Sequence, residues 1–379
     1  MYKAIKYISW HEASGYGHAA RAYMLGLHRA GVPLVWQPIT GGHGSGPYYQ
    51  AFDGRAVGDP ELDPFCNLPL EYDTVVMHLV PEYIPIWRQK EAGKRLIGYC
   101  VWETDKLPRH WPALLNQLDG VAVPTDWNRQ VFTSSGVRVP IAVIPHILRP
   151  LGTAENEWNP ALSPDDFIFY TIGDWTARKS VWFTLRAFLQ TFTANESVSL
   201  VVKTSARDFT RTRRRFRPWA EPGTASAVTA LMRAFPHPAR IVLIDRFISR
   251  PALAALHQRG DCYVSLCRSE GWGLPAFDAA GMGKPVIMTG FGGQLVFLSP
   301  DDAFLVDYTL VPVQDPNGYP SYSPDQCWAE PSVTHAAGLL RRVYENRPEA
   351  RQKGARLAAY AAAHFNEQVV TSKWLEILN

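Results

Sequence analysis

Long apolar runs, paired cysteines and a strong charge of one sign are all missing from this sequence. No segment approaches the roughly 20 consecutive apolar residues that a membrane-spanning helix needs. Residues 1–10 are predicted to begin a strand directly and lack the apolar run of a secretory leader. The formal net charge of +3 is too small to require a nucleic acid or a membrane as a partner. We therefore expect a cytoplasmic protein whose membrane association, where it occurs, is peripheral.

The cysteines exclude two further classes of protein. There are five of them, which is an odd number, and they lack the paired short spacings of a zinc site or a disulfide framework. They are Cys66, Cys100, Cys262, Cys267 and Cys327. No Asp-x-Asp metal motif stands near a predicted strand end, and Asp301 and Asp302 are adjacent in a turn. We expect reduced thiols, no metal and no cofactor.

What the sequence does have is a regular alternation of short apolar segments with helical ones. A chain of 379 residues, 46% of them hydrophobic, is long enough for two cores. Strands are predicted at residues 3–9, 32–37, 74–78, 95–101, 120–123 and 141–144, and again at 167–172, 197–203, 240–244, 262–266 and 285–288. The polar residues 151–165 between the two sets are typical of a linker. The pattern predicts an α/β protein of two doubly wound, Rossmann-like domains, with ligands bound at the carboxyl ends of the strands.

Two acids lie in the most informative stretch of the chain, residues 265–293. Glu270 directly follows the strand predicted at 262–266, and Asp278 lies in the helix predicted at 276–282. The N-terminus of such a helix presents unpaired N–H groups. Together these groups suit a ligand that carries hydroxyls and phosphates.

A basic pair, Arg178 and Lys179, stands between the strand at 167–172 and the next helix. Lys supplies a point charge, Arg a bidentate fork and the helix its N–H groups, so the place suits a diphosphate. Lys203, at the end of the following predicted strand, is a further candidate cation. The alternative for such a pair is a solvated surface position.

The run Glu270-Gly271-Trp272-Gly273-Leu274-Pro275 with Asp278 resembles the signature of retaining GT-B glycosyltransferases of the family 4 type, also described as glycosyl transferases group 1. In that family two glutamates frame a Gly-aromatic-Gly-Leu-Pro run, and an Arg-Lys-Gly segment holds the donor diphosphate. Three residues depart from this pattern: Asp278 is one methylene shorter, Ser180 replaces a glycine, and Asp174 stands where many relatives have an arginine. In that family the second acid holds the nucleotide ribose, so the shorter Asp278 weakens the expectation of a ribose contact.

The resemblance implies a GT-B fold with two domains facing a central cleft. It implies an acceptor-side domain over residues 1–150, completed by a helix at about 365–379, and a donor-binding domain over 151–364. It implies catalytic roles for Glu270, Lys179 and Arg178, with Glu270 orienting the donor sugar. The donor-binding residues that it implies are Gly15, Gly17, Lys203, Glu270, Gly271, Trp272, Gly273, Leu274, Asp278, Gly292 and Gly293, and the acceptor-side residues are His18, Glu103 and His146.

The glycine-rich loop at residues 11–18 has a second interpretation. Gly15, Gly17 and Ala20 match the outline of a dinucleotide fingerprint. A nicotinamide site wants an acid at the end of the second strand, whereas that strand ends in Gln37. We expect amides near Gly15, Gly17 and the pair Gly292-Gly293 to face the donor diphosphate. A tight turn with no ligand is the alternative. For His146 the alternative is a domain-joining residue.

The expected activity is transfer of a hexose, with retention and without a metal, from a UDP- or GDP-linked donor, UDP-glucose being favoured over GDP-mannose. The expected acceptor is a saccharide or a lipid-linked saccharide. A modified base in DNA is the alternative acceptor. A UDP-sugar 2-epimerase shares the architecture but fits the acidic run less well, and a non-catalytic sugar-nucleotide-binding protein is the alternative of another class.

Two further stretches bear on the acceptor. Residues 41–64 are rich in glycine and proline and are interpreted as an acceptor-side loop. Residues 207–219 interleave arginines with aromatic residues, which suits an anionic acceptor such as a lipid phosphate or a nucleic acid. The alternative is a solvated flank. The arginines with which a nucleic acid would interact are Arg211, Arg213, Arg214, Arg215 and Arg217.

Overall fold

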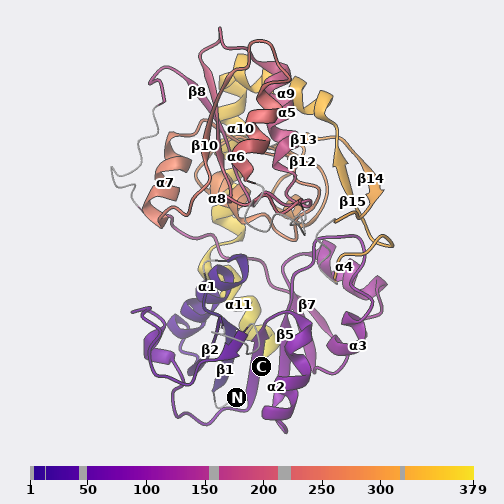
Figure 1. The fold of residues 1–379 in the computed structure, drawn as a ribbon. Helices are drawn as coiled ribbons and strands as arrows, with labels where there is room; N and C mark the ends of the chain where they lie inside the picture. Colours follow the sequence, from indigo (N-terminus) through magenta and orange to yellow (C-terminus); the bar gives the residue numbers. More distant parts are fainter. Residues whose placement is uncertain (1–3, 13, 42–48, 153–161, 212–222, 316–320) are drawn as a thin grey trace. The chain divides into compact units, whose positions relative to one another are not determined.

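The computed structural model describes residues 4–12, 14–41, 49–152, 162–211, 223–315 and 321–379 (Figure 1). The chain divides into two compact units. Unit 1 comprises Met1–Trp102, Lys106–Leu148 and His364–Asn379, and unit 2 comprises Glu103–Asp105 and Arg149–Ala363. Each unit is built around its own sheet and its own hydrophobic core.

Unit 1 contains a seven-stranded sheet in the order β3-β2-β1-β4-β5-β6-β7, parallel except for β3. Its strands are β1 (Ile5–Trp10), β2 (Leu34–Gly41), β3 (Tyr49–Ala51), β4 (Thr74–His78), β5 (Arg95–Tyr99), β6 (Gly120–Val123) and β7 (Ile141–Val143). Its helices are α1 (Gly15–Arg29), η1 (Asp63–Phe65), η2 (Pro81–Tyr83), α2 (Ile84–Lys90), α3 (Trp111–Leu115), α4 (Asp126–Ser134) and α11 (Glu367–Leu378).

Unit 2 contains a six-stranded, wholly parallel sheet in the order β10-β9-β8-β11-β12-β13 and a separate antiparallel pair, β14 and β15. Its strands are β8 (Phe167–Ile172), β9 (Val198–Lys203), β10 (Arg240–Ile244), β11 (Cys262–Ser265), β12 (Val286–Thr289), β13 (Phe304–Val306), β14 (Tyr308–Pro312) and β15 (Cys327–Pro331). Its helices are α5 (Val181–Thr191), α6 (Thr224–Met232), α7 (Arg250–Arg259), α8 (Leu274–Gly281), η3 (Gly293–Val296), α9 (Val333–Glu345) and α10 (Arg347–His364).

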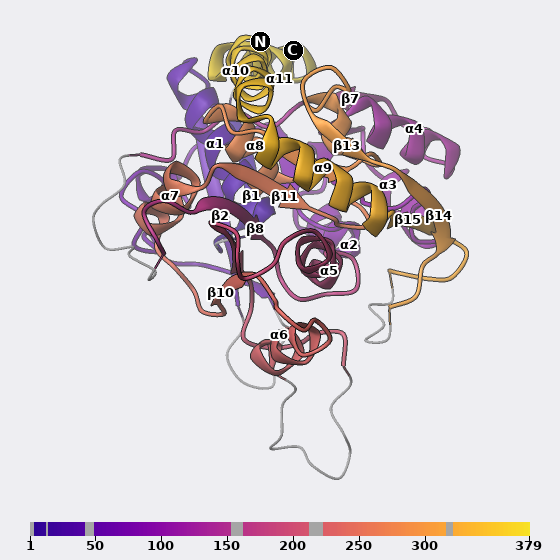
Figure 2. The same cartoon turned by 90° about the horizontal axis from the view of Figure 1, so that it is seen from above.

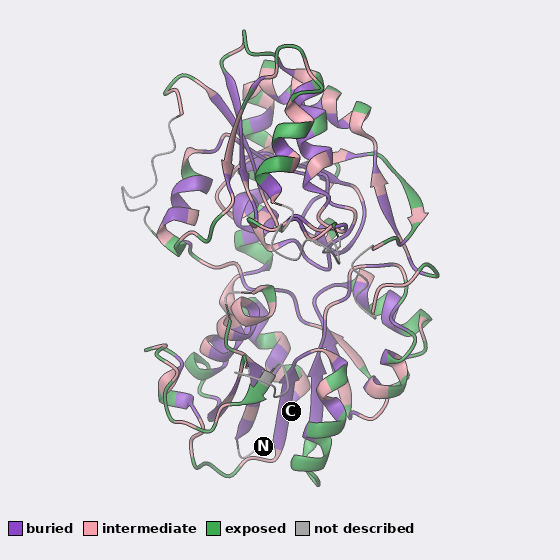
Figure 3. Cartoon of the chain, viewed as in Figure 1, coloured by how far each residue is buried: buried purple, intermediate pink, exposed green. Residues whose placement is uncertain are grey.

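The strands of both sheets are largely buried, while the helices keep exposed outer faces (Figure 3). Along β8, alternate residues serve the two faces of the sheet. Phe167 and Phe169 enter the core beneath α5 and α9, which lie side by side (Figure 2). Tyr170 points to the opposite face and meets His257 of α7. Burying one such phenylalanine contributes about 1.5–3 kcal/mol, so the alternation commits β8 to one register.

The C-terminal helix α11 packs on α1 and completes the core of unit 1. The Trp374 ring is fully buried, and its centroid lies 5.5 Å from that of Tyr23 and 6.2 Å from that of Tyr7. The contact leaves no room for a side chain at Gly26 of α1, where a Cβ would lie 2.6 Å from the Thr371 hydroxyl.

The α/β prediction of two doubly wound parallel sheets is confirmed. In each sheet the first strands add successively toward one edge. The next strand then pairs with the other side of the first strand, so the strand order reverses between β1 and β4 and between β8 and β11. The loops that follow two such neighbouring strands meet at one edge, where ligands of this fold class bind. Four strands were not predicted. They are β3, which lies within the expected irregular stretch 41–64 and covers the edge of β2, the edge strand β13, and the antiparallel pair β14 and β15.

Candidate functional site

The donor-side candidates gather at the carboxyl edge of the sheet in unit 2. Strands β8 and β11 are parallel neighbours. Arg178 and Lys179 lie in the loop after β8, and Glu270 lies in the loop after β11. The prediction placed each group beside its own strand end, and the order of the strands brings the two loops together.

Glu270 forms ion pairs with both cations. Its Oε1 accepts from Lys179 Nζ, and its Oε2 lies 3.1 Å from Arg178 Nη1. Burial by itself would raise the pKa of this carboxyl group, but Lys179 and Arg178 hold the pKa below its ordinary value. Glu270 is therefore an ionised acceptor of hydrogen bonds, not an acid that donates a proton at neutral pH.

A second carboxylate meets the same guanidinium. Glu103 Oε1 lies 3.4 Å from Arg178 Nη2, and the Tyr322 hydroxyl donates to Glu103 Oε2 at 3.0 Å. Burial would lower the pKa of Arg178, but Glu103, Tyr322 and Glu270 together raise it well above the ordinary value. Glu103, expected on the acceptor side, thus lies among the donor-side residues of unit 2. Its role toward an acceptor stays a prediction.

The backbone conformation of Ser180 helps to position the neighbouring pair Arg178 and Lys179. Ser180 adopts φ 40° and ψ 44°, the left-handed region that favours glycine. Its buried hydroxyl donates to Leu266 O at 2.8 Å, and a hydrogen bond of this kind contributes about 1 kcal/mol. The bond offsets the cost of the conformation, which explains how serine replaces the glycine of the resembled motif. Thr176 Oγ1 accepts from the Lys179 N–H at 3.2 Å and holds the preceding turn.

Arg268 anchors this loop, and the sequence analysis did not identify it. Its Nη1 donates to Ala177 O at 3.1 Å, its backbone N–H donates to Arg178 O at 2.8 Å, and its Nε and Nη2 lie 2.9 and 2.7 Å from Glu330 Oε2. Three aromatic rings surround the guanidinium: Trp182, Phe183 and Trp328, with centroids 5.7, 5.3 and 5.0 Å away. Nothing in the local pattern of the chain points to Glu330 as the partner.

Asp278 belongs to a different cluster from Glu270. Both of its oxygens are taken by Arg149, with Nε 3.0 Å from Oδ1 and Nη2 2.6 Å from Oδ2. The Asp278 side chain is 1% exposed, against 16% for Arg149. Burial lowers the pKa of the nearby His257 to about 4, and the charge of Asp278 opposes that shift. His257 Nδ1 lies 3.0 Å from the Tyr170 hydroxyl. Sequence reasoning missed Arg149 altogether.

The expected glycines are needed chiefly for close packing of backbone. A Cβ at Gly293 would lie 1.9 Å from Gly271 O, and Gly292 has φ 109°. The Gly293 N–H donates to Glu270 O at 2.8 Å. That amide is therefore engaged within the protein, and the expectation that amides near Gly292-Gly293 face a donor diphosphate stays a prediction. Gly273, with φ 87°, is the N-cap residue that precedes helix α8.

Three other predicted donor residues lie in varied surroundings. Trp272 is a core residue and is 3% exposed. Its ring centroid lies 5.0 Å from that of Phe277 and 5.4 Å from that of Phe297. Leu274 opens helix α8 and is partly buried. Lys203 Nζ donates to Thr204 O at 3.1 Å; burial lowers its pKa, and the charges of nearby aspartates oppose this shift. Their contacts with a donor stay predictions.

In unit 1 helix α1 begins earlier than predicted, so Gly15, Gly17 and His18 lie in its first turn and not in a preceding loop. Ser14 caps the helix by accepting from the Gly17 N–H at 3.2 Å. A Cβ at Gly17 would lie 2.1 Å from Glu12 O. The turn therefore requires glycine for a steric reason, and the Gly17 amide is engaged by the cap.

His146 is buried in unit 1, where its ring stacks on Tyr23 with centroids 6.0 Å apart and planes 7° apart. Tyr23 donates to Pro145 O at 2.9 Å. His78 lies nearby. Burial lowers the pKa of His78 well below the ordinary value, and the charge of His146 contributes to the same shift. His146 is thus part of the core of unit 1, and its acceptor role stays a prediction.

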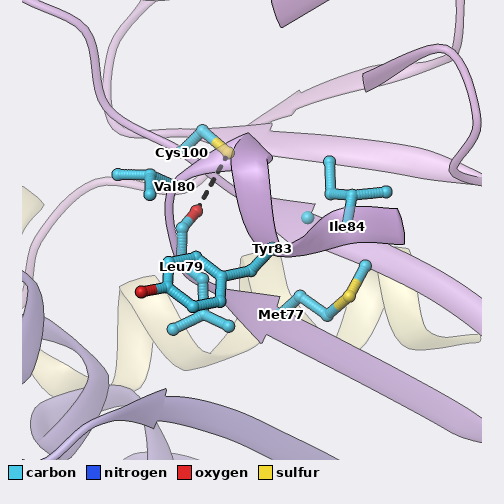
Figure 4. A pocket seen from close by; sticks show the side chains of 7 residues that line it. Met77, Leu79, Val80, Tyr83, Ile84 and Cys100 are labelled. Atoms are coloured by element: carbon cyan, nitrogen blue, oxygen red, sulfur yellow. Dashed lines mark hydrogen bonds between the residues drawn. The ribbon is translucent and has the colours of Figure 1, made fainter. Parts of the chain in front are cut away.

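Other features of the described chain carry little toward a site. A crevice in unit 1 is lined by Met77, Leu79, Val80, Tyr83, Ile84, Gly98 and Cys100 (Figure 4). The Cys100 thiol turns to Leu79 O at 3.5 Å, and the crevice has no volume that a water molecule can occupy. Among the described residues no group of His, Cys, Asp and Glu is placed to hold a metal ion, and no helix is long and apolar enough to cross a membrane. Arg213, Arg214, Arg215 and Arg217 lie outside the described residues.

Comparison with known proteins places the fold. No protein-family model and no curated protein matches the sequence. Sucrose-phosphate synthase from Thermosynechococcus elongatus superposes with a TM-score of 0.70 at 14% identity, over 99% of this chain and 98% of that chain. Trehalose 6-phosphate synthase from Burkholderia multivorans gives 0.65 at 15% identity, over 100% and 98%. HepE from Anabaena, in complex with UDP and glucose, gives 0.63 at 12% identity, over 99% of both chains. The likeness extends along the whole chain and confirms the GT-B fold, with its two Rossmann-like domains, that the sequence resemblance implied.

Proposed function

We propose that this protein is a retaining, metal-independent hexosyltransferase that moves a sugar from a nucleoside diphosphate sugar to a hydroxyl group of an acceptor. One observation carries the proposal. Buried Glu270 and the partly buried Arg178 and Lys179 form an ionic cluster at the β8/β11 edge, where ligands of this fold class bind.

The chemistry follows from where charge develops. Cleavage of the bond between the anomeric carbon and the phosphate oxygen leaves negative charge on the diphosphate, and the sugar gains oxocarbenium character. Lys179 and Arg178 stabilise the leaving group, and a single preorganised donor of this kind lowers the barrier by about 3–4 kcal/mol. The acceptor oxygen bonds to the anomeric carbon on the face that the phosphate leaves, and its proton passes to the departing phosphate oxygen.

Glu270 acts on the sugar and not on the proton. Its carboxylate is ionised, and it is surrounded by cations that keep it so. An ionised carboxylate accepts hydrogen bonds from sugar hydroxyls. These bonds orient the ring so that the acceptor attacks the anomeric carbon on the face that the phosphate leaves. Arg268 keeps Arg178 in position through the backbone bonds that it makes to the loop.

UDP is the proposed nucleotide, with GDP as the alternative. Structures of HepE hold UDP, UDP with glucose, and UDP-glucose, and that protein resembles this chain over 99% of its length. A saccharide or lipid-linked saccharide is the proposed acceptor. A modified base in DNA is the alternative, and it depends on the arginine run at 207–219.

Calorimetry with UDP and GDP, each with and without a chelator, tests donor recognition. We expect one nucleotide to bind with an affinity that the chelator leaves unchanged. Absence of binding by both, or binding lost on chelation, contradicts the proposal. Release of labelled glucose from UDP-glucose then separates an enzyme from a sugar-nucleotide-binding protein, and the anomeric signal of the product in NMR spectra tests retention.

A further inference from the structure

The antiparallel pair β14–β15, which the sequence did not predict, packs against the loop that carries Arg178. Ala177 of that loop shares a small hydrophobic cluster with Val313 and Trp328, and each of the three is at most 4% exposed. Tyr322, which lies between the two strands in the chain, packs on the same cluster, with its ring centroid 6.5 Å from that of Trp328. The β14–β15 pair therefore fixes the backbone that directly precedes Arg178.

The same strands hold a carboxylate against the Arg178 guanidinium. Glu103 and Asp105 belong to unit 2, and two hydrogen bonds join Asp105 to Cys327, the first residue of β15. The Asp105 N–H donates to Cys327 O at 3.2 Å, and the Cys327 N–H donates to Asp105 Oδ1 at 2.5 Å. The Tyr322 hydroxyl then donates to Glu103 Oε2 at 3.0 Å, which leaves Glu103 Oε1 3.4 Å from Arg178 Nη2.

These contacts hold the guanidinium from two sides. Burial and the charge of Glu103 raise the pKa of Tyr322 well above its ordinary value, so its hydroxyl keeps its proton and donates at neutral pH. Arg178 Nη1 is held by Ser269 O at 2.9 Å and by Glu270 Oε2 at 3.1 Å, whereas Nη2 faces Glu103. A guanidinium has five N–H groups, so donors remain for a phosphate.

We propose that Glu103 and Tyr322 are positioning residues for Arg178, and that the β14–β15 pair holds them in place. They act on the reaction by fixing the guanidinium against the leaving diphosphate, and they do not touch the acceptor. This inference rests on the proposed function, which assigns Arg178 to the leaving group. Such support matters because a misplacement of about 1 Å in a catalytic group can cost about a hundredfold in rate.

Hydrolysis of UDP-glucose and transfer of its glucose, measured on the same variants, test whether Glu103 acts through Arg178. Both reactions break the same bond to the leaving phosphate, so a residue that positions Arg178 affects both. We expect Tyr322→Phe and Glu103→Gln each to lower kcat of both reactions by the same factor of about ten, with the donor KM changed less than about threefold. Tyr308→Phe removes an exposed hydroxyl from β14 and is the matched control, which should leave both rates unchanged. A loss confined to transfer would place Glu103 on the acceptor side and overturn the inference.

Double variants separate positioning from direct action. Arg178→Lys keeps the charge but loses the fork that Glu103 and Ser269 hold from two sides. In that background Tyr322→Phe should lower kcat by less than about twofold, because the group that it positions is already gone. A full tenfold loss in the Arg178→Lys background would show that Tyr322 acts independently of Arg178, and would overturn the inference.

A third measurement needs no substrate. In NMR spectra of the free protein labelled with ¹⁵N-arginine, the Nη signals of Arg178, identified by their absence from Arg178→Lys, report rotation of the guanidinium. We expect slow exchange between them in the wild type and in Tyr308→Phe, and faster exchange in Tyr322→Phe and Glu103→Gln. Equal exchange rates in the wild type and Tyr322→Phe would overturn the inference. Slow exchange in a wild-type protein that neither binds UDP nor turns over UDP-glucose would contradict the proposed function instead, so the two failures are distinguishable.

Discussion

At the scale of single residues, charge balance governs what the loop after β11 can do. Glu270 lies between two cations, and Arg178 lies between two carboxylates. Each charge is held by a partner of opposite sign in a largely buried setting, so the geometry is set before a substrate arrives. Preorganised charge of this kind stabilises a transition state without the cost of rearrangement during reaction.

We expect Glu270→Ala and Lys179→Ala each to lower kcat/KM for sugar transfer by about a hundredfold or more, since both residues act on charge that changes in the transition state. Initial rates over a range of donor concentrations provide the measurement. Arg186→Ala removes a cation from the exposed face of α5 and should leave the rate unchanged. Near-normal turnover of Lys179→Ala would refute its assignment to the diphosphate.

The pH dependence of the same transfer rate tests the ionisation of Glu270. The pKa of Glu270 is lower in the folded protein than in the unfolded chain, where it is about 4.3. Its ionised form therefore stabilises the folded protein above about pH 4.3, and this stabilisation is lost as pH falls through the lower, folded pKa. We therefore expect no change of rate between about pH 5 and 8 that depends on Glu270. A rate change in this window that Glu270→Gln removes would contradict the assignment of Glu270 as an ionised orienting group.

At the scale of elements, the site depends on two loops packed backbone to backbone. The start of η3 contacts the Glu270-Gly271 backbone so closely that a methyl group at Gly293 has no space. The loops after β11 and β12 therefore form one packed unit. A change in one displaces the other.

We expect Gly293→Ala to lower donor affinity and thermal stability together, because its Cβ would lie 1.9 Å from Gly271 O and backbone must move to admit it. Gly338→Ala in α9 is the matched control. Its Cβ meets nothing within 4 Å, and alanine in an exposed helix position is favoured over glycine by about 0.5–1 kcal/mol. Calorimetric unfolding and titration with UDP measure both effects. Equal behaviour of the two variants would exclude the packing argument.

The arginine-rich sequence at residues 207–219 bears on the acceptor. If Arg211, Arg213, Arg214, Arg215 and Arg217 contact phosphates, binding of the acceptor releases counterions and weakens steeply with salt. We expect a variant with these arginines changed to glutamine to lose transfer to an anionic acceptor while donor binding is unchanged. Transfer to modified duplex DNA, to a lipid diphosphate sugar and to a free glycan, at low and moderate salt, gives the comparison. Wild-type behaviour on all three acceptors would make the run a solvated flank.

At the scale of the whole molecule, buried histidines make stability depend on pH. His257 is fully buried, and burial lowers its pKa to about 4, below the value of about 6.5 in an unfolded chain. Between these values the unfolded state binds a proton that the folded state does not, so stability falls as pH is lowered. For His257 alone the loss from pH 7 to pH 5 is about 2 kcal/mol.

We expect His257→Gln to flatten the pH dependence of the free energy of unfolding between pH 7 and pH 5 by about this amount, even though the variant is less stable at pH 7. Urea unfolding at the two pH values provides the measurement. His237→Gln changes an exposed histidine and should retain the wild-type dependence. An unaltered slope in His257→Gln would show that this histidine binds protons equally in the folded and the unfolded state over this range, and would contradict the prediction.

The sequence by itself determined the alternation of strands and helices, and with it the two doubly wound sheets. Short apolar runs bounded by glycine and proline have few alternatives once they alternate with amphipathic segments. The order of strands in such sheets then brings the loops after β8 and β11 together. That Glu270, Arg178 and Lys179 belong to one site was implied by the family resemblance before their contacts were known.

Only the tertiary structure decided which charged groups pair. Arg149 lies 129 residues before Asp278, and Glu330 lies 62 residues after Arg268. No local pattern specifies such partners, because the choice follows from which side chains are buried together and must be compensated there. Asp278 shows the consequence: its place in the motif indicates a ligand contact, whereas its burial against Arg149 commits it to another side chain of the same unit.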